Sequence, residues 1–193
     1  EAPKNVNKVI QNAERAYSNL LTSELPKKGT LLFSNSISEV AKSAQLVIEA
    51  VPERLSAKQS AYEEIESSAD KNMIIASSTS GILPSDLQAE MAHPDRLIVA
   101  HPFNPVYLLP LVEIVGGAKT SKDAIDKASS IFTNIGMFPL HIKKEIPAFI
   151  ADRLLESVWR EALWLVNDDI ATTEEIDDAI RYGFGLRWAQ MGL

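Results

Sequence analysis

Residues 97–105 read Leu-Ile-Val-Ala-His-Pro-Phe-Asn-Pro, and this stretch decides the fold class. The four apolar residues at its start are typical of a buried strand, and the prolines that follow end that strand. His101 and Asn104 come directly after the apolar run. Ligands bind at the carboxyl ends of strands in open α/β sheets, so both side chains are well placed for catalysis.

Similar short apolar runs occur on both sides of this strand, and helical patterns separate them. Such alternation is typical of β-α-β units and a mostly parallel sheet. We therefore expect a Rossmann-like α/β domain that is incomplete at its N-terminus, because it opens on a helical pattern where such domains open on a strand. The expected strands are 31–33, 46–49, 73–77, 97–101, 111–115 and 138–142, and the expected helices between them are 7–21, 55–69, 84–91 and 122–135.

The composition changes near residue 145. Residues 145–193 hold ten acidic and four basic side chains, a net charge of −6, and all three tryptophans. The pattern there is helical throughout, over 148–167 and 173–182, and Pro147 is expected to open the first helix. We therefore divide the chain into an α/β domain, 1–145, and the start of an all-helical domain, 146–193.

The composition also excludes several classes of protein. The chain has no cysteine, which removes disulfides and thiol nucleophiles, and its pI near 5.0 argues against nucleic-acid binding. No apolar run reaches the roughly 20 residues that a membrane span requires, and no signal peptide opens the chain. We expect a cytoplasmic protein with no metal, no nucleic-acid partner and no membrane partner.

Glu113 lies at the centre of an apolar run, Leu-Val-Glu-Ile-Val, twelve positions after His101. An unpaired carboxylate is costly to bury, and a carboxylate that orients a histidine explains its position economically. A loop histidine with an edge-strand glutamate facing water explains the same spacing. The spacing alone favours this second interpretation.

Polar residues follow two further strands. Ser77-Ser78-Thr79-Ser80-Gly81 offers hydroxyls to a ligand or to the cap of the next helix. Glu49-Ala50-Val51-Pro52-Glu53, with Lys58 beyond it, has a simpler interpretation as acids at the start of a helix. Taken alone, the residues favour a structural role for both stretches. No G-x-G-x-x-G or phosphate loop can be assembled from the eight glycines.

In order and spacing, these stretches together with Pro-Ala-Phe-Ile-Ala-Asp-Arg-Leu at 147–154 resemble the L-3-hydroxyacyl-CoA dehydrogenase superfamily. The resemblance covers nearly the whole chain. It implies that 1–145 is a partial NAD-binding domain without its glycine loop. It also implies that 146–193 begins a helical domain for substrate binding and dimerisation, with a homodimer when the protein is full length.

The resemblance also implies a role for each candidate residue. His101 is the general base and Glu113 the acid paired with it, whereas Ser80 and Asn104 contact the substrate near its reacting hydroxyl and count as catalytic. The implied cofactor-binding residues are Ala50, Glu53, Lys58, Ser80 and Asn104.

Asp152 stands where enzymes of this superfamily that act on CoA esters have asparagine, and residues 182–192 resemble the branch that oxidises small free hydroxy acids. Enzymes that hold acyl-CoA present Lys or Arg to its phosphates, whereas the quaternary ammonium of L-carnitine suits carboxylates and aromatic faces. We therefore expect NAD-dependent oxidation of L-carnitine to 3-dehydrocarnitine. A 3-hydroxyacyl-CoA or gulonate-type dehydrogenase and a non-catalytic, crystallin-like protein are the alternatives. The expected substrate-binding residues are Ser80, Asn104, Asp152, Tyr182, Phe184 and Trp188.

Overall fold

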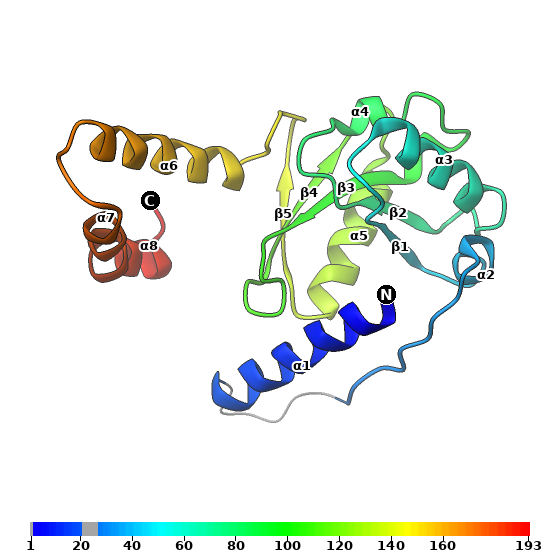
Figure 1. Ribbon diagram of the computed structural model, residues 1–193. Coiled ribbons are helices and arrows are strands. Elements are labelled where there is room, and N and C mark those ends of the chain that lie inside the picture. The colour runs from blue at the N-terminus through cyan, green and yellow to red at the C-terminus, as the bar shows by residue number, and fades with distance from the viewer. Residues whose placement is uncertain (1, 21–26) are drawn as a thin grey trace. The chain divides into compact units, whose positions relative to one another are not determined.

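A computed structural model describes residues 2–20 and 27–193. The chain forms two compact units, Glu1–Pro147 and Ala148–Leu193 (Figure 1). The first unit contains a sheet with helices and the second is helical. No helix in the described ranges is long and apolar enough to cross a bilayer.

A five-stranded sheet forms the centre of the first unit (Figure 1). In spatial order its strands are β1 Leu46–Glu49, β2 Ile74–Ser77, β3 Leu97–Pro102, β4 Leu111–Gly116 and β5 Phe138–Ile142. Neighbouring strands pair in parallel except β3 and β4, which pair antiparallel. The mostly parallel, Rossmann-like sheet predicted from the sequence is therefore confirmed.

Helices connect the parallel strands of the first unit. The described helices are α1 Ala2–Leu20, α2 Ile37–Ala41, α3 Leu55–Glu66, α4 Pro84–Leu87 and α5 Lys122–Asn134, with a 3-10 turn at Pro94–Arg96. α3 joins β1 to β2, and α5 joins β4 to β5. α4 is shorter than the helix expected over 84–91, whereas α2 was not expected.

Helix α5 packs against one face of the sheet. It contributes Ala124, Ala128 and Phe132, which recur every four residues and so share one side of the helix. The sheet contributes alternate residues to this core: Ile74, Ala76, Ile98, Ala100, Val112 and Ile114. The residues between them are buried as well, so both faces of the central strands are covered. Because successive side chains point to opposite faces, His101 and Glu113 lie on the face away from α5.

The strand expected at residues 31–33 is wrong. Leu31, Leu32 and Phe33 have no regular structure, and Leu32 is 83% exposed. The described sheet ends at β1, and residues 31–33 pair with no strand of it, so they gain neither ladder hydrogen bonds nor a buried face. Strand formation depends on cross-strand pairing and burial more than on the residues themselves, so a short apolar run is weak evidence for a strand.

The second unit contains α6 Ala151–Asn167, α7 Thr173–Ala179 and α8 Gly185–Met191, with a π-helical turn at Ile180–Phe184. A capping box opens α7: Thr172 Oγ1 accepts from the Glu175 N–H, and the Glu175 carboxylate accepts from the Thr172 N–H. The α-helix ends at Ala179, and the backbone continues as the π-helical turn Ile180–Phe184, so the helical pattern expected over 173–182 is confirmed with a change of helix type.

The helix start expected at Pro147 is also wrong. Ala148 and Phe149 have positive φ angles of 61° and 50°, in the left-handed region that interrupts a right-handed helix. Helix α6 begins after them, at Ala151. Proline at a helix start gives only a local preference, and here the backbone that follows it turns before the helix begins.

Candidate active site

His101 and Glu113 face each other across β3 and β4. They occupy opposed positions in the antiparallel ladder, and His101 Nδ1 lies 2.9 Å from Glu113 Oε2. Both side chains are buried, so neither faces water as the alternative interpretation required. An ionised carboxylate only accepts hydrogen bonds, which places the Nδ1 proton on the histidine and leaves Nε2 of a neutral imidazole as an acceptor. The hydrogen bond thus fixes the orientation of the imidazole.

Three polar stretches meet at the sheet edge where β1, β2 and β3 end. In the parallel ladders Glu49 lies opposite Ser77, and Ser77 lies opposite Val99, two residues before His101. This register brings the residues that follow β1 and β2 to the same edge as His101. The edge is the position at which ligands bind in open α/β sheets.

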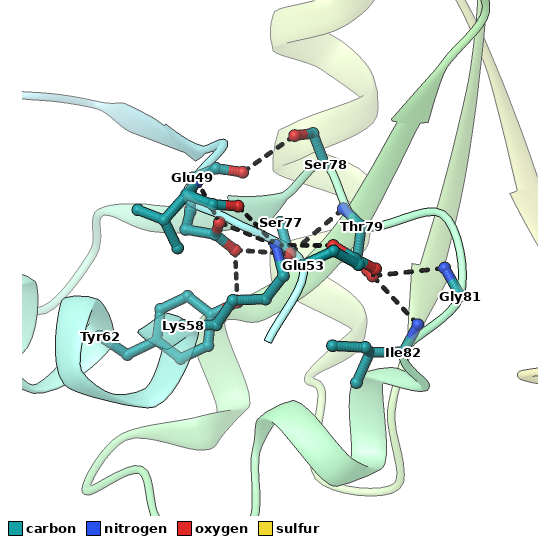
Figure 2. Close-up of polar contacts among 10 residues, drawn as sticks. Glu49, Glu53, Lys58, Tyr62, Ser77, Ser78, Thr79, Gly81 and Ile82 are labelled. Carbon is teal, nitrogen blue, oxygen red and sulfur yellow. Dashed lines mark hydrogen bonds and ion pairs between the residues drawn. The ribbon is translucent and has the colours of Figure 1, made fainter. Parts of the chain in front are cut away.

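Glu49 accepts four hydrogen bonds in the interior at this edge (Figure 2). Its Oε1 accepts from the Val51 N–H at 2.7 Å and from Lys58 Nζ at 2.9 Å. Its Oε2 accepts from the Tyr62 hydroxyl at 2.8 Å and from the Ser77 hydroxyl at 2.7 Å. Burial and the neighbouring Glu49 charge raise the pKa of Tyr62 above its usual range, which keeps this phenol a donor. Four donors make the burial of this carboxylate tolerable.

This role of Glu49 was not predicted from the sequence. Glu49 was expected to be one of two acids at the start of a helix, whereas it is the last residue of a strand and its carboxylate is buried. A signal was present, because an acid within an apolar run predicts a buried partner, as it did for Glu113. Lys58 and Tyr62 lie nine and thirteen residues later, on α3.

Lys58 joins Glu49 to Glu53. Its buried ammonium nitrogen lies 2.9 Å from Glu49 Oε1, 3.1 Å from Glu53 Oε2 and 3.4 Å from the Val51 carbonyl oxygen. These three acceptors match the three hydrogens of the ammonium group. Lys58 therefore orients the Glu53 carboxylate, whose side chain is 48% exposed.

Thr79 holds Glu53 from the other side. Its hydroxyl donates to Glu53 Oε1, and its oxygen accepts from the Ile82 N–H at 3.0 Å and from the Gly81 N–H at 3.4 Å (Figure 2). Burial raises the pKa of Glu53, but the hydrogen bonds from Thr79 and Lys58, with the Lys58 charge, bring it below the usual value. Glu53 is thus a half-exposed anion that can accept hydrogen bonds from a ligand.

The other candidates of the first unit lie on exposed loops that follow its strands. Ala50 comes directly after β1, Ser80 follows β2, and Asn104 follows β3. The Asn104–Pro105 peptide bond is cis. All three are open to solvent, and their roles toward cofactor and substrate stay predictions.

The remaining candidates belong to the second unit. Asp152 lies in the first turn of α6. The Phe184 and Trp188 rings pack against each other with centroids 4.6 Å apart, and Tyr182 is largely exposed. Their part in substrate binding stays a prediction.

Comparison with known protein families identifies both parts of the chain. Residues 2–146 match the model of the 3-hydroxyacyl-CoA dehydrogenase NAD binding domain, and residues 149–193 match that of the C-terminal domain. The chain belongs to the 3-hydroxyacyl-CoA dehydrogenase family. The resemblance inferred from the motifs is therefore confirmed.

Among curated relatives, an L-carnitine dehydrogenase of Mesorhizobium japonicum is 55% identical over all of this chain and 53% of its own length. Another, from Oceanobacillus iheyensis, is 56% identical over 95% of this chain and 60% of its own length. The chain thus spans about half the length of these members of the family.

Solved structures of the family share the fold. The 5-formyl-3-hydroxy-2-methylpyridine 4-carboxylic acid 5-dehydrogenase, described as an NAD⁺-dependent dismutase, is 31% identical, with a TM-score of 0.86 over 98% of this chain and 60% of its own. The (S)-3-hydroxybutyryl-CoA dehydrogenase of Ralstonia eutropha is 29% identical, with a TM-score of 0.76 over 93% of this chain and 64% of its own.

Proposed function

We propose that this protein oxidises the 3-hydroxyl group of L-carnitine to 3-dehydrocarnitine with NAD, and that His101 and Glu113 are its catalytic pair. The observation that carries the proposal is the buried hydrogen bond of 2.9 Å between His101 Nδ1 and Glu113 Oε2 at the ligand-binding edge of the sheet. Family membership supports the reaction class, and the names of the relatives at 55–56% identity support the substrate.

The proposed roles follow from the orientation of the imidazole. His101 accepts the proton of the substrate hydroxyl at Nε2, and Glu113 fixes the tautomer and stabilises the imidazolium that forms. Ser80 and Asn104 hold the substrate oxygen by hydrogen bonds, which favours the change from hydroxyl to carbonyl. When bound, NAD accepts the hydride that leaves C3.

The residues beside β1 fit the nicotinamide half of NAD. Glu53 is an anionic acceptor, and beside it the stretch from Ser77 to Ser80 carries hydroxyl groups. Such groups suit ribose hydroxyls and a carboxamide, whereas the anion repels a phosphate. Ala50 carries a small side chain and leaves room there. We propose that Lys58 contributes to this cofactor-side site through Glu53.

L-Carnitine is favoured over acyl-CoA by the charge of the second unit. Residues 148–193 hold nine acidic and four basic side chains, a net charge of −5, which repels the phosphates of CoA and attracts a quaternary ammonium. Such a cation gains about 0.5–2 kcal/mol from each aromatic face that it contacts. We propose Asp152, Tyr182, Phe184 and Trp188 as the groups that hold it.

A substrate panel assayed with NAD on the full-length protein tests this proposal. We expect turnover of L-carnitine, discrimination against D-carnitine and no activity on 3-hydroxybutyryl-CoA. Efficient turnover of the CoA ester without L-carnitine would contradict the substrate and restore the acyl-CoA alternative, and turnover of gulonate alone would favour the neighbouring branch. An absence of turnover with every member of the panel would favour the crystallin-like alternative.

A further inference from the structure

Two loops at the sheet edge continue beyond the strand pairing that would hold them together. The β1–β2 ladder ends at Glu49 and Ser77, whereas the candidate ligand-binding residues Glu53 and Ser80 lie three or four positions further on. Ligand-binding side chains must be held in position to within a fraction of an ångström. Loops that carry such side chains beyond the end of a strand ladder therefore need further hydrogen bonds to fix them.

Residues 78 and 79 supply such bonds. The Ser78 N–H donates to the Glu49 carbonyl at 2.9 Å, and the Ser78 hydroxyl donates to the same oxygen at 3.0 Å. One residue later, the Thr79 hydroxyl donates to the Glu53 carboxylate. Figure 2 shows these contacts as two successive links between the loops. The second link is the one that reaches the candidate ligand-binding residues.

The Thr79 hydroxyl uses both its hydrogen and its lone pairs. Its side chain is fully buried, its hydrogen goes to Glu53, and its oxygen accepts from the Gly81 and Ile82 N–H groups. Both N–H groups follow Ser80 directly, so the hydroxyl of Thr79 closes the turn that carries this serine. A single hydroxyl therefore holds the carboxylate on one loop and the backbone that follows Ser80 on the other.

We propose that Thr79 is a positioning residue that sets Glu53 and Ser80 at the cofactor and substrate side of the site. The inference rests on the proposed function, which gives those two residues their ligands. Thr79 itself is fully buried, so we assign it no direct contact with NAD or substrate. Its effect on turnover passes through the two groups that it holds.

We expect the global fold to be independent of this hydroxyl. Neither the β1–β2 ladder nor any of the four hydrogen bonds to the Glu49 carboxylate involves it. Loss of the hydroxyl leaves the Glu53 carboxylate with the Lys58 ammonium and the Gly81 backbone as partners, and it leaves the Gly81 and Ile82 N–H groups without this acceptor. The expected defect is therefore one of alignment.

Valine replaces threonine with nearly the same shape but without the hydroxyl, and serine keeps the hydroxyl. We expect Thr79→Val in the full-length enzyme to raise KM for NAD at least about 10-fold and to lower kcat by about 10–100-fold, the scale of a small misplacement of reacting groups. Thr79→Ser should stay within about 3-fold of the original enzyme in both constants, because the hydroxyl bonds remain. The matched control is Thr133→Val at an exposed position on α5, which should change neither.

Several outcomes would overturn the inference. Unchanged kcat and KM in Thr79→Val would exclude a positioning role, and equal losses in Thr79→Ser and Thr79→Val would assign the effect to side-chain shape. A lowered Tm with unchanged kinetics of the folded enzyme would show a merely structural residue. In Thr79→Val a methyl group replaces the hydroxyl and faces the Gly81 and Ile82 N–H groups, whereas Thr79→Ala removes the hydroxyl without adding that methyl group. Should Thr79→Val not fold, the kinetics of Thr79→Ala test the positioning role instead.

Failure of the proposed function would look different. In that case the original enzyme itself would not oxidise L-carnitine. Calorimetric titration of the original protein, Thr79→Val and Thr79→Ser with NAD would then still test whether the hydroxyl supports cofactor binding. Equal dissociation constants for all three would overturn the inference.

Discussion

At the scale of single residues, the proposed catalytic pair of His101 and Glu113 predicts a large effect for one substitution. His101→Ala removes the proposed base and should lower kcat at least about 10²-fold, the usual loss for general base catalysis. Steady-state rates with saturating L-carnitine and NAD measure the effect. His141→Ala is the matched control, because His141 lies exposed on β5. Near-normal kcat in His101→Ala would contradict the assignment.

The partner of His101 should have a smaller effect. Glu113→Gln keeps the shape of the side chain and one acceptor oxygen but loses the charge that stabilises the imidazolium. We expect kcat to fall, by less than in His101→Ala, with the KM for NAD unchanged. A loss as large as that of His101→Ala, without a change in fold by circular dichroism, would show that Glu113 does more than orient and stabilise the imidazole.

The lowered pKa of Glu53 predicts how its contribution to stability depends on pH. A carboxyl whose pKa is lower in the folded state stabilises the fold fully above its unfolded pKa, here 4.5, and loses that contribution as the pH falls through the folded pKa. Comparison of the original protein with Glu53→Gln by urea unfolding should therefore show a difference at neutral pH that shrinks below pH 4.5. Because Glu53 is half exposed, the difference should not exceed about 1 kcal/mol. A difference that grows on acidification would contradict the cause given for the shift.

Two buried acids show what the sequence could and could not predict about the site. The pairing of Glu113 with His101 rested on the family resemblance, because the twelve-residue spacing alone favoured a loop histidine and an exposed glutamate. Glu49 has the same burial, but its donors come from α3 and from the end of β2, and two of them are a lysine and a tyrosine that look ordinary on a helix. Spacing along one chain does not reveal which helix side chains reach a strand end, so this network required the structure.

At the scale of elements, the stability of helix α5, which packs on the sheet, depends on its N-cap. Ser121 Oγ accepts from the Ala124 N–H at 3.1 Å and so opens α5. Ser121→Ala should lower the free energy of unfolding by about 1 kcal/mol, the usual value of an N-cap hydrogen bond. Denaturant unfolding measures it. Ser129→Ala, in the middle of the same helix, is the control and should be neutral or slightly stabilising, because alanine is the better helix former. An equal loss in both variants would show that the cap is not the cause.

The sequence predicted the strands of the described sheet closely because burial leaves a strong pattern. The expected strands 46–49 and 138–142 coincide with β1 and β5, and the other three differ by one residue at an end. The expected strand 31–33 failed because an apolar run without a neighbouring ladder does not form a strand. The start of α6 was predicted wrongly because it depends on the backbone conformation of the preceding residues. The positive φ angles at Ala148 and Phe149 leave no clear pattern in the sequence.

At the scale of the whole molecule, burial is distributed unevenly between the two units. The first unit contains the buried core of the sheet and α5. Helices α6, α7 and α8 of the second unit contain no buried residue. They carry large exposed apolar side chains such as Trp159, which is 61% exposed. Apolar area removed from water is the main source of folding free energy, so the two units should differ in stability.

Hydrogen–deuterium exchange of the 193-residue chain tests this difference. Amide protection in a native protein reports the free energy of local opening, which is highest in well-buried strands and lowest where few apolar contacts hold an element. We expect amides of β2, β3 and β4 to exchange at least about 100-fold more slowly than those of α6, α7 and α8, since a difference of about 2.7 kcal/mol in opening free energy is enough for that factor. Helix α5, which is hydrogen-bonded like α6 but packs on the sheet, is the internal control and should exchange with the strands. Equal protection in α5 and α6 would contradict the argument, because hydrogen bonding within the helix would then outweigh burial of its apolar side.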